Sequence, residues 1–302
     1  MRRTFTVLLA VVAMLAVAIP VTAITRGGAP DAGEHPYVGL MVAYSADLTD
    51  DLDGDGEPDT PDIDGDGTDG DLVHDPVWRC SGTLINANVF VTAGHCTEPD
   101  GSDWGGEPML AAIWFDEDVE GGIPGNGYPL YELAPYTGVR NTHPLYNPGA
   151  FFLYDLGVVV LDGDGAAMDS YAALPEAGAI DDMGKGRRNS VVEAVGYGLQ
   201  KINPVMVQAD RIRLKADLMI VNTKGVAGIG NLPDSNSMMV SGDAKHGGTC
   251  FGDSGGPIFL GTDSNVIGAV TSFGLNGNCA GVGGVFRIDR QLELDWINGF
   301  GG

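Results

Sequence analysis

Three side chains in separate segments of this sequence could together make a nucleophile. Ser254 lies in the run GDSGGP at 252–257, where the glycines permit a tight turn. A serine hydroxyl becomes nucleophilic when a neighbouring base takes its proton, and a carboxylate can orient that base. His95, in VTAGHC at 91–96, and Asp155, in YDLG at 154–157, supply these two groups upstream. The set predicts acyl-transfer chemistry, such as the hydrolysis of a peptide bond.

These segments occur in the order His, Asp, Ser, and they resemble the chymotrypsin/trypsin-type serine peptidases. The similarity runs from Ile24 to a predicted C-terminal helix near 289–298, and it includes HPLYN at 143–147 and GYG at 196–198. An α/β-hydrolase would have the order Ser, Asp, His, which this chain contradicts. The resemblance implies a serine endopeptidase that acts on protein or peptide substrates through an acyl-enzyme and needs no cofactor for catalysis. Two alternatives are an esterase and a catalytically silent protease-like protein that binds a partner.

The resemblance also implies a role for each residue of the site. His95 would take the proton of Ser254 and later return it to the leaving amine, while Asp155 would fix the histidine tautomer. The backbone N–H groups of Gly252 and Ser254 would form the oxyanion hole, which stabilises the negative charge of the tetrahedral intermediate.

Short apolar runs separated by clusters of Gly, Asn, Asp and Pro predict an all-β chain. Such runs occur at 37–44, 89–93, 156–161, 191–197, 266–272 and 282–288, and only 291–298 has a helical pattern. The resemblance implies two six-stranded antiparallel β-barrels, with the active site between them, and a short C-terminal helix. The predicted limits are a signal peptide at 1–23 and a peptidase domain at 24–300, divided into a first barrel at 24–161 with an acidic insert at 47–75, a crossing segment at 162–188, and a second barrel with the helix at 189–300.

The first residues have the pattern of a secretory signal. Two arginines follow Met1, an apolar run extends from Val7 to Ile19, and small residues precede a cleavage position after Ala23. The run is shorter than the roughly 20 residues that span a membrane, although an uncleaved N-terminal anchor is the alternative. We therefore expect a secreted protein, extracellular or periplasmic, that is monomeric and does not bind membranes after signal cleavage. The net charge of −25 disfavours nucleic acid as a partner.

An exported chain with four cysteines is expected to form two disulfides, and four cysteines allow three connectivities. The resemblance selects one of them. It pairs Cys80 with Cys96 around the loop that carries His95, and Cys250 with Cys279 beside the substrate pocket.

The resemblance places five residues around the primary substrate pocket. Gly248, six residues before Ser254, would lie at the bottom, where trypsin-like enzymes carry an aspartate that pairs with a substrate Lys or Arg. The other four are Thr249, Ser272, Gly274 and Gly284. Because this pocket has no buried negative charge and small walls, we expect cleavage after large apolar or aromatic residues, or a broad preference.

In the family, a freed apolar N-terminus folds inward and its ammonium pairs with the aspartate before the catalytic serine, which is Asp253 here. Cleavage after Ala23 would expose Ile24, in ITRGG at 24–28, so export and activation would be one event. The extra residue before the glycine pair departs from the family pattern. The alternative is that Ile24 begins a surface strand and that Asp253 has another partner.

The insert at 47–75 contains 12 Asp, one Glu and no Lys or Arg. Within it, acidic residues recur at alternate positions and are followed by glycine, which is the ligand order of a calcium loop. The predicted ligands are Asp51, Asp53, Asp55, Glu57, Asp59, Asp62, Asp64 and Asp66. A calcium ion here would order the loop and take no part in the chemistry. The alternative is a solvated acidic loop that repels itself.

Isothermal titration calorimetry of the purified mature protein separates these two alternatives. A calcium loop of an extracellular protein should bind the ion with a dissociation constant of about 10⁻⁴–10⁻³ M. We therefore expect heat of binding at millimolar calcium, whereas no binding at that concentration would favour the solvated loop.

Overall fold

The computed structural model describes residues 28–45, 74, 76–98, 109–150, 152–181, 183, 191–203, 206–225, 236–243 and 246–301. The predicted signal segment, Ile24 and all eight predicted calcium ligands lie outside the described residues. Those hypotheses therefore stay predictions.

The first barrel is a closed antiparallel sheet with the strand order β2-β3-β4-β7-β6-β5. Its strands coincide with apolar stretches of the sequence, and every residue of β2 is buried. The strands are β2 (Val38–Ser45), β3 (Pro76–Leu84), β4 (Val89–Thr92), β5 (Met109–Trp114), β6 (Tyr136–Thr142) and β7 (Gly157–Leu161). Hydrophobic side chains from these strands fill the interior of the barrel, which makes it a rigid support for the loops at its ends.

The second barrel has the strand order β11-β12-β15-β14-β13-β8 and closes where β11 pairs with β8. Its strands are β8 (Val191–Gly196), β11 (Leu214–Asn222), β12 (Ser237–Gly242), β13 (Pro257–Phe259), β14 (Ile267–Gly274) and β15 (Gly281–Arg287). Alternate residues of β11, namely Leu214, Ala216 and Leu218, are buried in the core, as the period of a strand requires. The predicted fold of two six-stranded antiparallel barrels is confirmed.

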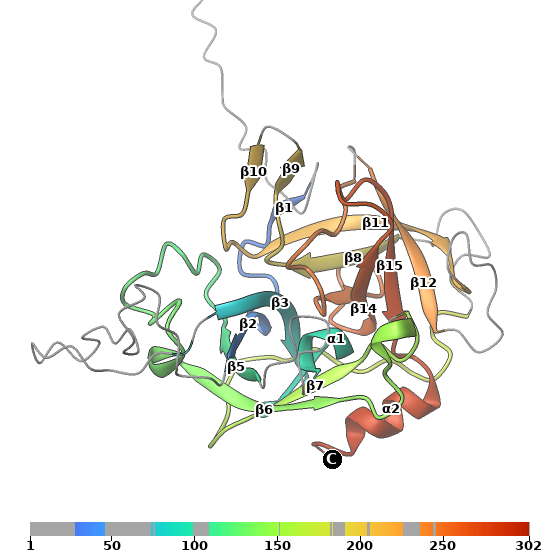
Figure 1. Ribbon diagram of the computed structural model, residues 1–302. Coiled ribbons are helices and arrows are strands. Elements are labelled where there is room, and N and C mark those ends of the chain that lie inside the picture. The colour runs from blue at the N-terminus through green and yellow to red at the C-terminus, as the bar shows by residue number, and fades with distance from the viewer. Residues whose placement is uncertain are drawn as a thin grey trace, which may run out of the picture.

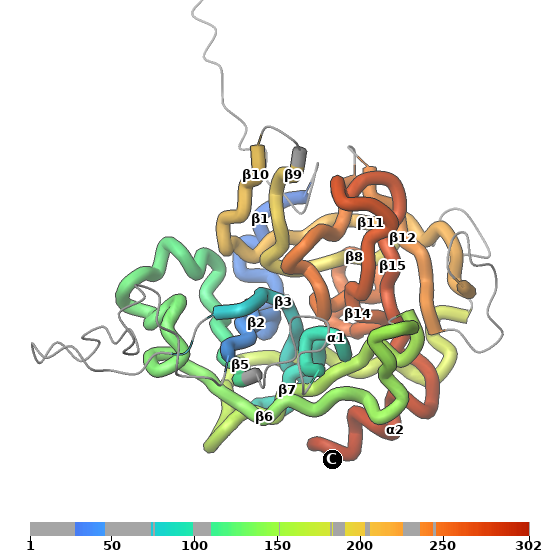
Figure 2. The backbone as a smooth tube through the Cα atoms, in the orientation of Figure 1, coloured from blue at the N-terminus to red at the C-terminus, as the bar shows by residue number. Residues whose placement is uncertain are grey.

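Figure 1 shows the two barrels packed against each other, the first in blue to green and the second in yellow to red. The chain passes from the first to the second through the segment after β7, which can be followed in Figure 2. Three short strands lie outside the barrels: β1 (Ala29–Pro30), which pairs with β11, and the hairpin of β9 (Lys201–Asn203) and β10 (Met206–Gln208). The predicted C-terminal helix is confirmed as α2 (Gln291–Asn298).

Hydrogen bonds of buried polar groups join the two barrels. The Arg213 N–H donates to the Glu117 carbonyl oxygen at 2.7 Å, and its guanidinium donates to the Phe115 carbonyl oxygen at 2.9 Å, both just after β5 of the first barrel. The Tyr197 hydroxyl donates to the Asp116 carbonyl oxygen at 2.7 Å. Because Arg213 and Tyr197 are both buried, these bonds are shielded from water and fix the relative position of the barrels.

A buried ion cluster fastens the crossing segment to the second barrel. The guanidinium of Arg287 donates to both carboxylate oxygens of Asp289 at 2.8 Å and to Asp181 at 2.9 Å. Arg287 and Asp289 are both fully buried. Asp181 also accepts from Arg290, but that pair is partly exposed to solvent.

The two arginines of this cluster should differ in their effect on stability. Arg287→Ala leaves the buried Asp289 carboxylate without its cation, which should lower the free energy of unfolding by about 3–5 kcal/mol. Arg290→Ala removes an exposed pair and should cost about 1 kcal/mol or less. Urea unfolding of the two variants measures the difference, and equal losses would contradict this account.

Candidate active site

The helix and strand that hold His95 and Asp155 lie side by side in the first barrel. His95 is in the single-turn helix α1 (Gly94–Thr97), and Asp155 lies two residues before β7. The His95 Nδ1 is 2.9 Å from the Asp155 Oδ2, and the His95 backbone N–H donates to Oδ1 at 2.9 Å. Since a carboxylate can only accept, Nδ1 carries the hydrogen, and Nε2 is left with the lone pair that a general base needs.

Asp155 is fully buried, and donors from both barrels satisfy its charge. Besides His95, the hydroxyl of Ser272 on β14 donates to Oδ2 at 2.5 Å. The resemblance placed Ser272 at the substrate pocket; in the structure it lines the cavity and also bonds Asp155. A short charge-assisted hydrogen bond of this kind limits the movement of the carboxylate.

Ring packing holds the backbone just before Asp155. Tyr154 has a φ of +57°, in the left-handed region that a residue with a side chain rarely adopts. Its ring is stacked on that of His143 at 5.3 Å, and His143 in turn meets Trp296 of α2 edge-on at 5.0 Å. Burial lowers the pKa of His143, which favours the neutral form of this ring in the stack. Packing against α2 therefore supports a strained turn beside Asp155.

Ser254 comes from the second barrel and lies across the cleft. Its carbonyl oxygen accepts a hydrogen bond from the Ser81 N–H of β3 at 2.7 Å. The next residue, Gly255, has a φ of +77°, and a Cβ atom there would overlap the side chain of Thr92. Only glycine fits this turn, which brings Ser254 to the same cavity as His95.

The N–H groups of the predicted oxyanion hole are available. Within the part of the chain that the structure describes, neither the Gly252 nor the Ser254 N–H donates to a protein acceptor. The Gly252 φ of +95° again requires glycine. Two unpaired donors beside a nucleophile could bind a developing oxyanion.

His95 and Ser254 open into a cavity of about 550 Å³. Three of the five predicted pocket residues, Thr249, Ser272 and Gly274, line it. Phe251, which was not predicted from the sequence, also lines the cavity and is 56% exposed. The remaining lining residues are Pro148, Cys250, Thr271, Phe273, Leu275, Asn276, Gly277 and Cys279. Most of these side chains are apolar or small, which suits an apolar group.

Gly248 and Gly284, the other two predicted pocket residues, do not line this cavity. A Cβ atom at Gly248 would lie 2.7 Å from the Cα of Gly242, so the backbone there has no room for a side chain. A Cβ atom at Gly284 would overlap the ring of Phe273, so that ring covers Gly284.

The neighbouring Gly283 is not a lining residue either, but it faces Thr249, which does line the cavity. It pairs with Gly274 across β14 and β15, and a Cβ atom on it would lie 3.1 Å from the Thr249 Oγ1. Because the two glycines are adjacent and neither carries a side chain, the sequence does not indicate which of them faces the pocket. Successive residues of a strand point to opposite faces, and β14 also has a bulge between Thr271 and Phe273 that shifts the register.

Asp253 is buried beneath the oxyanion loop with little compensation for its charge. Its two oxygens accept from the N–H groups of Gly198 and Cys250, at 2.8 and 2.9 Å. Burial raises the pKa of Asp253 to about 7, and these two hydrogen bonds offset only part of that rise. No cation among the described residues pairs with it, so the carboxylate lacks the partner that full burial calls for.

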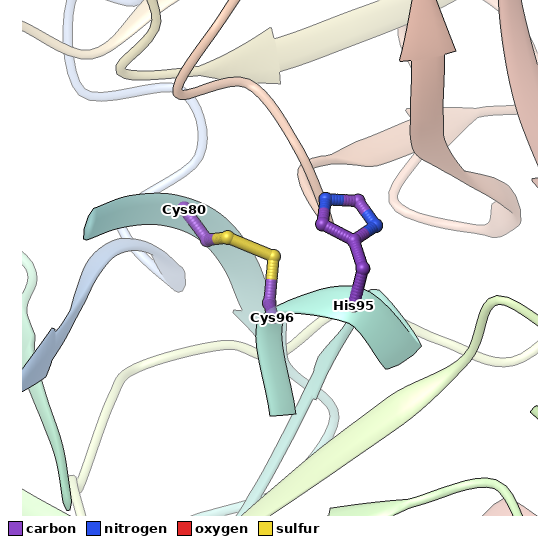
Figure 3. Close-up of side chains that lie close together, drawn as sticks. All are labelled: Cys80, His95 and Cys96. Carbon is purple, nitrogen blue, oxygen red and sulfur yellow. A yellow bond between two sulfur atoms is a disulfide. The ribbon is translucent and has the colours of Figure 1, made fainter. Parts of the chain in front are cut away.

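Both implied disulfides are present, Cys80–Cys96 and Cys250–Cys279. Figure 3 shows the first beside the ring of His95. The sulfur atoms of Cys80 and Cys96 and a ring nitrogen of His95 lie within 4.8 Å of one another, and such atoms can bind metals. However, the two sulfurs are bonded to each other and are not thiolates. The group therefore stabilises the His95 segment and gives no indication of a metal centre.

Comparison with known proteins agrees with this geometry. The family model described as Trypsin matches residues 71–297. The chain belongs to the trypsin family of serine proteases. This trypsin-family chain is 28% identical over 229 residues to brachyurin from Leptuca pugilator, an alignment that covers 75% of the chain and 89% of the relative.

Two solved structures share the fold of this trypsin-family protein. HL collagenase superposes with a TM-score of 0.56, and a mutant of human heparin binding protein with 0.53. Each is 17% identical and covers 91% of this chain, and the matches span 96% and 94% of the respective relatives. At that identity the likeness concerns the fold alone. No helix in the described ranges is long and apolar enough to cross a membrane.

Proposed function

We propose that this trypsin-family protein is a secreted serine endopeptidase with His95, Asp155 and Ser254 as its catalytic triad. The observation that carries the proposal is the bond between the buried Asp155 carboxylate and the His95 Nδ1, in a cavity that also exposes Ser254. This arrangement supports Nε2 as the base and Ser254, at the same opening, as the nucleophile. Protein and peptide chains are the substrates that the family implies.

In the proposed reaction, His95 accepts the Ser254 proton while the hydroxyl oxygen attacks the substrate carbonyl carbon. The developing negative charge is stabilised by the N–H groups of Gly252 and Ser254, and the imidazolium by Asp155. His95 then protonates the leaving amine, and a water molecule hydrolyses the acyl-enzyme by the same route.

The proposed specificity is for large apolar residues, or broad, on the N-terminal side of the cleaved bond. The cavity of about 550 Å³ carries no carboxylate among its lining residues. A substrate Lys or Arg would therefore lose its hydration without gaining an ion pair. We propose Gly283, rather than Gly284, as the wall residue that keeps the pocket wide, because it faces Thr249.

Three further proposals concern the mature protein. We propose that a signal peptide at 1–23 directs secretion, that the acidic insert holds a structural calcium ion, and that the freed Ile24 ammonium pairs with Asp253. The last proposal is supported by the burial of Asp253 without a cationic partner among the described residues. An ammonium there would offset the cost of burying that charge.

Cleavage-site profiling on a diverse peptide mixture in millimolar calcium tests the proposed function. The mature protein should cut after large apolar residues, and Ser254→Ala should remove about 10³-fold or more of the activity. Cuts after Lys or Arg would refute the pocket assignment. Activity that survives in Ser254→Ala would refute the assignment of the nucleophile.

The pH dependence of stability tests the pairing of Ile24 with Asp253. Without an ammonium partner, the folded chain holds a proton on Asp253 up to about pH 7, whereas the unfolded chain releases it near 3.8. The contribution of this group is therefore present at low pH and is lost as pH rises from about 4 to 7, at a cost of about 4 kcal/mol. With the partner in place, that loss should disappear.

Two forms that differ by one residue isolate this effect. A chain that begins at Ala23 displaces the ammonium, whereas one that begins at Ile24 retains it, and the other titrating groups are the same in both. Urea unfolding between pH 4 and 7 should show the loss of stability only in the form that begins at Ala23. Identical pH profiles would contradict the pairing.

A further inference from the structure

The hydroxyl of Ser81 connects the first barrel to the loop that would form the oxyanion hole. Ser81 lies on β3 next to Cys80 and is fully buried. Its Oγ donates to the Gly252 carbonyl oxygen at 2.8 Å and accepts from the Tyr197 N–H at 3.0 Å. The single hydroxyl hydrogen is thus directed at Gly252.

The Gly252 N–H lies in the peptide plane between Phe251 and Gly252, and the next plane limits how Gly252 can rotate. In the plane between Phe251 and Gly252, the C=O and the N–H point in opposite directions. The Leu199 N–H holds the Phe251 carbonyl oxygen at 2.8 Å, so the Gly252 N–H points away from Leu199. The next plane begins with the Gly252 carbonyl, which Ser81 holds.

Gly252 needs such restraint because it has more backbone freedom than any other residue. Its φ of +95° lies in a region that glycine can leave at little cost. Two hydrogen bonds, one on each side, restrict that rotation. The bond from Leu199 stays within the second barrel, whereas the bond from Ser81 comes from the barrel that carries His95.

We propose that Ser81 is a positioning residue for the oxyanion hole. Its side chain holds the Gly252 carbonyl and so limits rotation of the Gly252 backbone, while its backbone N–H holds the Ser254 carbonyl oxygen at 2.7 Å. One residue of the first barrel thus positions both residues that supply the oxyanion donors. The catalytic value of this contact rests on the proposed function, but the contact itself can be tested without catalysis.

Ser81→Ala removes the hydroxyl, and Thr83→Val is a matched control on the same strand. Thr83 is also fully buried, and its hydroxyl donates to the Tyr37 carbonyl oxygen at 3.3 Å. That bond does not involve the oxyanion loop. Hydrogen exchange followed by mass spectrometry should show the amides of 250–256 exchanging about tenfold faster in Ser81→Ala, and unchanged in Thr83→Val. Exchange equal to wild type in Ser81→Ala would overturn the proposal, whether or not the protein cleaves peptides.

Kinetics give a second readout that a general loss of stability would not change. The value of kcat should fall about tenfold in Ser81→Ala with little change in KM, because the oxyanion exists only after attack; outright removal of a donor costs about 10²–10³. A peptide aldehyde, which forms an oxyanion with the serine, should lose about tenfold in affinity, while the corresponding alcohol should not. An unchanged aldehyde-to-alcohol ratio in Ser81→Ala would overturn the proposal. Failure of the wild type to bind the aldehyde would refute the proposed function, and the exchange measurement would still decide on the contact.

Discussion

The site depends on the hydrogen bond from the Ser81 N–H to the Ser254 carbonyl oxygen, which joins the two barrels at their point of contact. His95 and Asp155 belong to the first barrel, whereas Ser254 belongs to the second. A small relative displacement of the barrels would therefore separate the base from the nucleophile, and a shift of about 1 Å can cost 10²-fold in rate. The buried bonds of Arg213 and Tyr197 to the carbonyl oxygens of Phe115 and Asp116, just after β5, have the same consequence, although they lie away from the cavity.

The two buried aspartates of the site are stabilised in different ways. Asp155 accepts from His95 and Ser272, so the fold itself satisfies its charge. Asp253 accepts only two backbone N–H groups among the described residues, and burial raises its pKa to about 7. The Asp155 carboxylate therefore needs no further partner, whereas the state of Asp253 beneath the oxyanion loop depends on whether a positive charge lies next to it.

Local patterns predicted an all-β chain and α2, and the family resemblance carried by the short motifs implied the two barrels, both disulfide pairings and the cavity positions of His95, Ser254 and Thr249. These features depend on short motifs and on alternation within single strands. The choice between Gly283 and Gly284 could not be made from the sequence, because the two are adjacent, point to opposite faces of β15 and carry no side chain whose polarity would tell the faces apart.

The contact of Ser81 with Gly252 was also beyond the sequence. The two residues are 171 positions apart, and they meet only when both barrels have formed. Serine is common in strands and turns, so nothing in its residue type or its neighbours indicates the partner. Such contacts depend on how two domains dock, which short-range patterns do not encode.

The ring contact between α2 and the first barrel can form only late in synthesis. Trp296 packs on His143, which stacks on Tyr154 beside Asp155. The ribosome makes α2 after every strand of both barrels. A nascent chain that has been made only as far as Ser254 thus lacks the Trp296 packing that supports the turn before Asp155. Any unfolded segment of the same chain therefore meets a site that is still incomplete.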